Sequence, residues 1–186
     1  MRERVREAAA TTILEAVEHV AAERGIEATS TAAIAERAGV AVGTLYNYFP
    51  DRDALIVGLF KLRREEMLPR IIAAADAARG LPFEQRVRAY LTGVAEVFDQ
   101  FRPFCRVAMS AEGIRVKRST PAVLTVCTDA LIEIVKPVAK ERAKEVAVMV
   151  FGALKAMMHA RIESNEPLAP AAQLLADTLL EGMLKR

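Results

Sequence analysis

The sequence predicts an all-α protein, and three observations lead to this fold class. Apolar residues recur at the period of a helix almost throughout the chain. No run of strand length alternates apolar with polar residues, and glycine and proline fall mainly between the periodic segments. The chain has 186 residues, of which 53% are hydrophobic and 27% charged, so it can bury a core and is not an intrinsically disordered protein.

The expected helices follow from these breaks. The first helix ends at Gly25, and on it Glu15, Glu18 and Glu23 are expected to face outward, opposite an apolar stripe. About nine helices are expected in all. They are the first helix, about 31–38, about 42–48, a longer helix that starts after Pro50 and runs to about Ala78 with a bend at Pro69, and, beyond the break at Gly80-Leu81-Pro82, about 83–101, 103–115, 121–142, 144–164 and 169–185.

Several classes of protein are excluded by composition and motif content. The longest uncharged stretch, Ala38–Pro50, is too short for a membrane-spanning helix, which needs about 18–20 residues. The first residues mix charges of both signs without an apolar segment behind them, so no secretory signal is expected. Cys105 and Cys127 form no Cys-x-x-Cys pair and predict two buried, reduced thiols in a cytoplasmic protein. Without metal-ligand spacing or a phosphate loop, neither a metal nor a cofactor is expected.

The segment from Thr29 to Leu55 predicts a helix-turn-helix. Ser30 or Thr31 suits the N-cap of a helix, because a hydroxyl there accepts from a free backbone N–H. Gly39 suits the left-handed residue that ends a helix. Since Pro50 follows soon afterwards, the next helix is short, and two short helices joined by a tight glycine turn form this motif.

The second of these short helices carries no charge between Ala41 and Pro50, and Leu45 and Phe49 are expected to point inward. Its exposed face is expected to consist of Val42, Thr44, Tyr46, Asn47 and Tyr48. Amide, hydroxyl and small apolar groups of this kind suit base edges in the DNA major groove. The absence of a side chain at Gly43 lets the backbone approach the groove wall. Arg52, which follows, is expected to contact a phosphate.

Three strings in this region resemble the DNA-binding region of the TetR family of bacterial transcriptional regulators: Ile34–Val40 (IAERAGV), Gly43–Phe49 (GTLYNYF) and Arg52–Leu55 (RDAL). The resemblance covers about residues 5–60. It implies a helix-turn-helix DNA-binding domain over residues 1–50. A helical effector-binding and dimerisation domain is implied over residues 51–186, with residues 51–78 as a linking helix.

The resemblance also implies roles for single residues. Ser30 and Thr31 touch phosphates, Thr44 and Tyr46 lie at base edges with Val42 and Gly43 beside them, and Asn47, Tyr48 and Arg52 hold the DNA backbone. Relatives often carry serine or threonine where this chain has Ala41, and a polar residue where it has Ala32, so a helix cap and one contact are missing.

Charge argues for modest non-specific DNA affinity. Net charge is only +2, and residues 1–55 carry six arginines against nine acids. Arg2, Arg4 and Arg6 are expected to form a flexible arm that enters the minor groove, and the salt dependence of binding is expected to be shallow. The basic stretch 102–118, with Arg102, Arg106, Arg115, Lys117 and Arg118, is either a solvated helix face or a site for an anionic effector.

In the second half of the chain, aromatic, sulfur-containing and aliphatic residues at helical spacing form either plain core or a pocket for a small apolar effector. The candidate pocket residues are Tyr90, Val94, Phe98, Phe101, Phe104, Cys105, Met109, Cys127, Leu131, Phe151 and Met158. The resemblance favours the pocket, since relatives bind effectors among these helices.

The last two predicted helices carry more apolar surface than one bundle needs, which predicts a two-fold homodimer. The interface residues are Val146, Val150, Ala153, Leu154, Met157, Leu175, Thr178, Leu179 and Gly182. Such a dimer places two recognition helices on one face of a palindromic DNA operator. The expected protein is therefore a repressor that an apolar effector releases from double-stranded DNA, with no membrane partner.

Three alternatives stay open. A DNA-binding dimer without effector control differs by showing no thermal stabilisation with apolar compounds. A helical protein-interaction module that has lost operator binding is compatible with the acidic first half. An enzyme would have to use Cys105, Cys127, His19 or His159, which lie on separate helices without a supporting motif.

Overall fold

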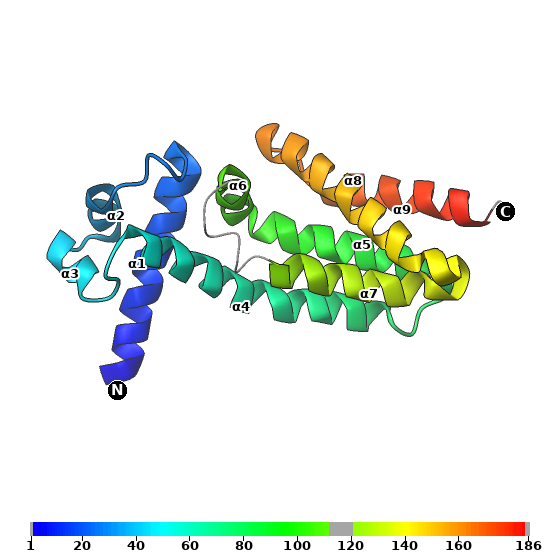
Figure 1. The fold of residues 1–186 in the computed structure, drawn as a ribbon, viewed down its shortest axis with the longest axis horizontal. Coiled ribbons are helices and arrows are strands. Elements are labelled where there is room, and N and C mark those ends of the chain that lie inside the picture. The colour runs from blue at the N-terminus through cyan, green and yellow to red at the C-terminus, as the bar shows by residue number, and fades with distance from the viewer. Residues whose placement is uncertain (1, 112–120, 185–186) are drawn as a thin grey trace. The chain divides into compact units, whose positions relative to one another are not determined.

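The computed structural model describes residues 2–111 and 121–184, and this part of the chain contains nine α-helices, one short 3₁₀-helix and no strand (Figure 1). The all-α fold class predicted from the sequence is confirmed. The helices are α1 (Arg2–Arg24), α2 (Thr31–Ala38), α3 (Val42–Tyr46), α4 (Arg52–Ala78), α5 (Phe83–Gln100), α6 (Arg102–Ser110), α7 (Pro121–Ala139), η2 (Lys140–Arg142), α8 (Ala143–Glu163) and α9 (Ala169–Leu184). None of the described helices is long and apolar enough to cross a membrane.

The chain divides into two compact units. Unit 1 consists of Met1–Glu65 with Pro103–Pro121, and unit 2 of Glu66–Arg102 with Ala122–Arg186. The division falls inside α4, between Glu65 and Glu66, so the two parts of this helix contribute to different units. These units do not coincide with the functional division expected at residue 50, which stays a prediction.

Unit 1 is built on the packing of α1 against α2 and of α2 against α3, with the first part of α4. Its core consists mainly of Ile13, Val17, Ile34, Leu45, Leu55 and Leu59, each at most 1% exposed. Gly58 on α4 is required by this packing. A Cβ added there would lie 3.0 Å from the ring of Phe49 and 3.1 Å from Leu14.

One acid of α1 does not lie where the helical pattern places it. Glu18 is expected on the outward face, but this prediction is wrong, because only 6% of the residue is exposed. Its Oε2 lies 2.5 Å from Nε of Arg63, whose side chain is 14% exposed. A buried carboxylate needs a charged or hydrogen-bonding partner, and α4 supplies one from far along the chain.

Unit 2 is a bundle in which α5 packs against α9 and α9 against α8. The second part of α4 approaches α5 closely, since a Cβ added to Gly93 would lie 3.0 Å from Cβ of Ala74. Tyr90 of α5 is fully buried, and its hydroxyl donates a hydrogen bond to the backbone oxygen of Cys127 on α7 at 2.8 Å. Arg70 of α4 stacks on Phe101, with its Cζ 4.8 Å from the ring centroid.

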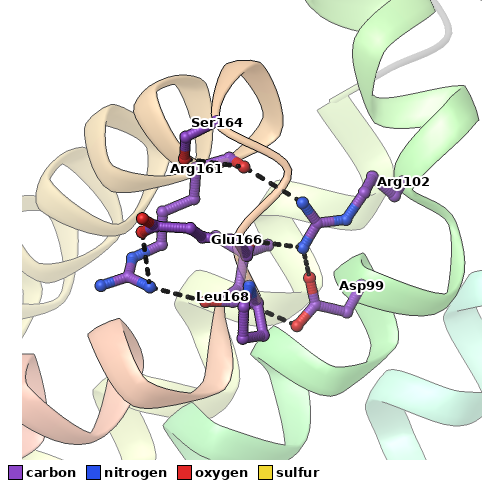
Figure 2. A network of polar contacts seen from close by, with 7 residues as sticks. Asp99, Arg102, Arg161, Ser164, Glu166 and Leu168 are labelled. Carbon is purple, nitrogen blue, oxygen red and sulfur yellow. Dashed lines mark hydrogen bonds and ion pairs between the residues drawn. The ribbon is translucent and has the colours of Figure 1, made fainter.

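A polar network fastens the connection between α8 and α9 to the end of α5 (Figure 2). The guanidinium of Arg102 donates to the carboxylate of Asp99, to the carbonyl of Arg161 at 3.1 Å and to the carbonyl of Glu166 at 2.6 Å. Asp99 also accepts from the backbone N–H of Leu168 at 2.7 Å, which satisfies a donor at the start of α9. The network therefore fixes where α9 begins.

The buried Cys127 predicts a loss of stability in alkaline solution. Burial raises the pKa of its thiol from 9.0 to about 12, and burial also raises the pKa of Tyr90. Between pH 9 and pH 12 the unfolded chain binds fewer protons than the folded one, so stability falls as pH rises. Below pH 9 neither state loses this proton and the effect is absent. We expect the Cys127 contribution to approach about 1.4 kcal/mol per pH unit.

Urea unfolding at a series of pH values between 8 and 11 measures this slope. The Cys127→Ala variant loses the thiol and should show a shallower decline above pH 9, whatever its stability at neutral pH. Equal slopes for the variant and the wild-type protein would contradict the assignment.

Candidate nucleic-acid interface

The helix-turn-helix predicted from the sequence is present in unit 1, with the expected caps. Ser30 is the N-cap of α2, and its Oγ accepts from the backbone N–H of Ala33 at 3.2 Å. Gly39 has a φ of +68°, the left-handed conformation that costs glycine least. The N–H of Val40 then donates back to the carbonyl of Ala35 at 3.0 Å, which completes the helix end.

Helix α3 and the residue after it present an uncharged face to solvent. Tyr46 is 48% exposed, Val42 is 40% exposed and Asn47 is exposed, whereas Leu45 is completely buried as expected. Gly43 is exposed, and a Cβ added there would meet nothing within 4 Å. Among the described residues, no side chain therefore requires a glycine at this position.

The remaining predicted contact residues lie around this face. Ser30 is exposed at the start of α2, and Thr31 and Thr44 are half-buried. Tyr48 is also half-buried, and the guanidinium of Arg6 lies over its ring with Cζ 5.9 Å from the centroid. Ala41 caps α3 without a side-chain hydrogen bond, as its missing hydroxyl predicts.

The basic N-terminal segment is helical. The expectation of a flexible arm formed by Arg2, Arg4 and Arg6 is wrong, because α1 begins at Arg2. Arg6 makes a cation–π contact with Tyr48, which connects the start of α1 to the segment that follows α3. A positive charge thus lies beside the predicted contact surface as part of a helix.

Arg52 donates hydrogen bonds to backbone carbonyls of this chain, whereas the sequence predicts a contact with a DNA phosphate. It is the first residue of α4 and half-buried. Its Nε donates to the carbonyl of Thr29 at 2.7 Å, and its Nη2 donates to the carbonyl of Ile26. Both acceptors belong to the connection between α1 and α2.

The predicted effector-pocket residues are distributed over both units. Phe104, Cys105 and Met109 belong to unit 1, and the others belong to unit 2. All are buried except Met109 and Met158, which are half-buried. Within unit 1, Phe104 makes an edge-to-face contact with Phe60, with ring centroids 5.0 Å apart. Of the basic stretch 102–118, Arg115, Lys117 and Arg118 lie outside the described residues.

A second surface feature is an apolar groove of about 540 Å³ along α8 and α9. Seven predicted interface residues line it: Val146, Val150, Ala153, Leu175, Thr178, Leu179 and Gly182. The other two, Leu154 and Met157, do not line it. Leu154 is buried inside unit 2, and Met157 is half-buried.

Sequence reasoning missed five further lining residues of the groove: Val138, Ala139, Arg142, Met149 and Met183. Met149 is 66% exposed, the highest value among the large apolar residues of the described chain. A signal for it exists in the sequence, since it lies three residues after Val146 and four before Ala153 on the same helix.

Comparison with known proteins identifies the first part of the chain. Residues 13–59 match the family model described as "Bacterial regulatory proteins, tetR family". The HTH-type transcriptional repressor KstR of Mycolicibacterium smegmatis is 45% identical over 76 residues, which cover 39% of this chain and 35% of that protein. The fatty acid metabolism regulator protein of Bacillus subtilis is 36% identical over 59 residues, 32% of this chain and 30% of that protein. The chain thus matches about a third of the length of these curated relatives.

Solved structures match the fold over nearly the whole chain. The fatty acid degradation regulator FadR from Bacillus halodurans has a TM-score of 0.77 at 20% identity, covering 94% of this chain and 96% of that one. FadR from Bacillus subtilis, in complex with stearoyl-CoA, has a TM-score of 0.73 at 18% identity, covering 92% and 98%. The segment that contains the helix-turn-helix, residues 13–59, is thus similar to the tetR family of bacterial regulatory proteins, and the fold of nearly the whole chain is shared with these solved structures.

Proposed function

We propose that this protein is a transcriptional regulator that binds double-stranded DNA sequence-specifically through α3. The exposed, uncharged face of α3 is the observation that carries this proposal. A solvated helix normally carries charged residues, whereas a helix that enters the major groove needs groups that hydrogen-bond to base edges or touch a thymine methyl group. Tyr46, Asn47 and Val42 supply such groups.

The regulator acts as a homodimer on a palindromic operator. The apolar groove along α8 and α9 supports this part of the proposal, because it contains most of the predicted interface residues. An interface between two copies of the same surface has two-fold symmetry, and DNA with matching symmetry is a palindrome. Met149, which is exposed on α8 and lines this groove, would become buried in such a dimer.

A small apolar effector releases this dimer from DNA. The buried aromatic and sulfur-containing residues of unit 2 are compatible with an apolar guest. The neighbouring FadR structure from Bacillus subtilis holds stearoyl-CoA, which supports an effector with a long apolar chain. The effector shifts the equilibrium between two arrangements of the protein by its difference in affinity for them, typically about 1–3 kcal/mol.

Selection of bound sequences from random duplex DNA tests the DNA-binding proposal directly. A palindromic consensus is the expected result. Enrichment of no sequence would contradict sequence-specific binding and favour a protein-interaction module.

A thermal-shift screen with fatty acyl-CoAs and other apolar compounds tests the effector, since a ligand that binds the folded state raises the melting temperature. A DNA-binding protein that no compound stabilises would indicate a regulator without effector control.

The Tyr46→Ala variant is expected to lose DNA affinity without losing stability. Because Tyr46 is 48% exposed, its truncation removes little packing inside unit 1. Loss of a contact to bases or phosphates costs about 1–3 kcal/mol, a tenfold to hundredfold weaker complex. Fluorescence anisotropy with a duplex selected by the wild-type protein measures this change. The Ile72→Ala variant, which truncates a comparably exposed residue on unit 2, should bind like the wild-type protein.

A further inference from the structure

We infer that Arg52 is a positioning residue of the DNA interface, which holds the start of α2 in place, and that it is not a phosphate ligand. The inference rests on the proposed function, because it assigns a role within the same DNA-binding surface. It concerns the α1–α2 connection, residues 25–30, and the first turn of α4.

The hydrogen bonds of Arg52 point into this connection. Its Nε donates to the carbonyl of Thr29 at 2.7 Å, and its Nη2 donates to the carbonyl of Ile26. Thr29 is only 1% exposed, and its hydroxyl donates to the carbonyl of Gly25 at 2.9 Å. Gly25 has a φ of +82°, so the connection begins with a sharp change of direction. Arg52 therefore fastens both ends of a short, tightly turned segment to α4.

Holding the carbonyl of Thr29 fixes the residue that follows. The peptide group is planar, so the orientation of the Thr29 carbonyl sets the orientation of the Ser30 N–H. Ser30 is the exposed N-cap of α2, and its Oγ accepts from Ala33. With Thr31 it is one of the two predicted phosphate contacts at this helix start. Arg52 thereby determines where these hydroxyls are presented.

The chemistry of the side chain agrees with this role. Two acceptors on different residues require donors in a fixed planar arrangement, which a guanidinium has and an ammonium lacks. A phosphate contact made for charge alone is served equally well by lysine, which binds as a point charge. Arginine and lysine at position 52 therefore distinguish the two roles.

The experiment compares Arg52→Lys and Arg52→Gln with the wild-type protein, using fluorescence anisotropy. Two probes are used over a series of salt concentrations: random-sequence duplex DNA and a duplex selected by the wild-type protein. For a positioning residue, both variants bind the selected duplex about tenfold more weakly. The slope of log affinity against log salt stays that of the wild-type protein, because no phosphate neutralisation is lost.

A phosphate ligand behaves in the opposite way. Arg52→Lys then binds like the wild-type protein, and Arg52→Gln reduces the salt slope by about 0.9 per phosphate lost. Lys61→Gln is the matched control for the loss of one charge. Lys61 is exposed on the same helix and pairs only at 4.0 Å with Glu65, so this variant should leave the affinity for the selected duplex unchanged.

A double-mutant cycle with Ser30→Ala separates positioning from general stability. If Arg52 acts through Ser30, removal of the Ser30 hydroxyl costs less DNA affinity in the Arg52→Lys background than in the wild-type protein. Additive losses of DNA affinity for the Arg52→Lys and Ser30→Ala variants overturn the inference. Arg52 variants that have a lower melting temperature but bind both probes like the wild-type protein overturn it as well. A wild-type protein that binds neither probe overturns the proposed function itself. Normal wild-type binding with a reduced slope for Arg52→Gln overturns this inference alone.

Discussion

Replacing Glu18 with alanine is expected to lower the free energy of unfolding by about 3–5 kcal/mol. The carboxylate is buried between α1 and α4 and lies 2.5 Å from Nε of Arg63. Its removal takes away a buried charged group that compensates the desolvation of the guanidinium. Urea unfolding followed by circular dichroism measures the change. Since both side chains belong to unit 1, the loss should appear first in that unit's helices.

A matched control lies on the same helix. Glu23 also pairs with an arginine, Arg37, at 3.0 Å, but its side chain is 51% exposed and that of Arg37 is 45% exposed. Exposed ion pairs contribute about 0–1 kcal/mol, so Glu23→Ala should be close to the wild-type protein. Equal effects of Glu18→Ala and Glu23→Ala would show that burial does not set the strength of the Glu18–Arg63 pair.

Replacing both partners by apolar residues extends this test. Burial of two charges is itself costly, and a well-packed apolar pair of similar volume is often as stable as the ion pair. The double variant Glu18→Leu with Arg63→Met is therefore expected to be more stable than either single variant. Additivity of the two single losses would contradict a direct interaction between these side chains.

Replacing Met149 with glutamate is expected to convert the proposed homodimer into monomers. Met149 is 66% exposed and lines the apolar groove along α8 and α9. Its replacement by glutamate should therefore change the stability of a single protomer little. In a two-fold interface the new carboxylate occurs twice and is removed from water, which costs several kcal/mol per ion, and Arg142 is the single cation among the described residues that line the groove. Sedimentation velocity of both proteins measures the oligomeric state, and binding to the selected duplex should weaken in parallel.

The control for this variant is Gln173→Glu, which adds the same charge at an exposed position of α9 that does not line the groove. It should remain a dimer with unchanged affinity for DNA. A dimeric Met149→Glu protein would place the interface elsewhere. A monomeric wild-type protein would contradict the homodimer altogether.

The local parts of the DNA-binding motif could be predicted from the sequence. An N-cap at Ser30 or Thr31 is confirmed with Ser30 in that place, and Gly39 as left-handed helix end and Leu45 as an inward residue are also confirmed. These features depend on neighbours within a few residues, and their residue preferences arise from local backbone geometry. The same holds for the apolar stripes of α8 and α9, whose residues largely meet in one groove.

Three roles could not be predicted, and each depends on residues far apart in the chain. The helical period placed Glu18 outside, but the period reports only an average preference, and a single acid can lie on the inner face when a distant arginine reaches it. Arg52 and Arg6 carry a charge that suits DNA, and their partners in the structure are two carbonyls and an aromatic ring. Sequence alone does not tell which acceptor lies within reach of a long, flexible side chain.

The sequence by itself determined the helices, their caps and the similarity of residues 13–59 to the tetR family, because hydrophobic period, capping residues and the strings around Gly43 are properties of contiguous residues. Only the tertiary structure decided what the charged side chains do. Glu18, Arg52 and Arg102 are bound by groups 45, 23 to 26 and up to 64 residues away, and folding alone brings such groups within hydrogen-bonding distance.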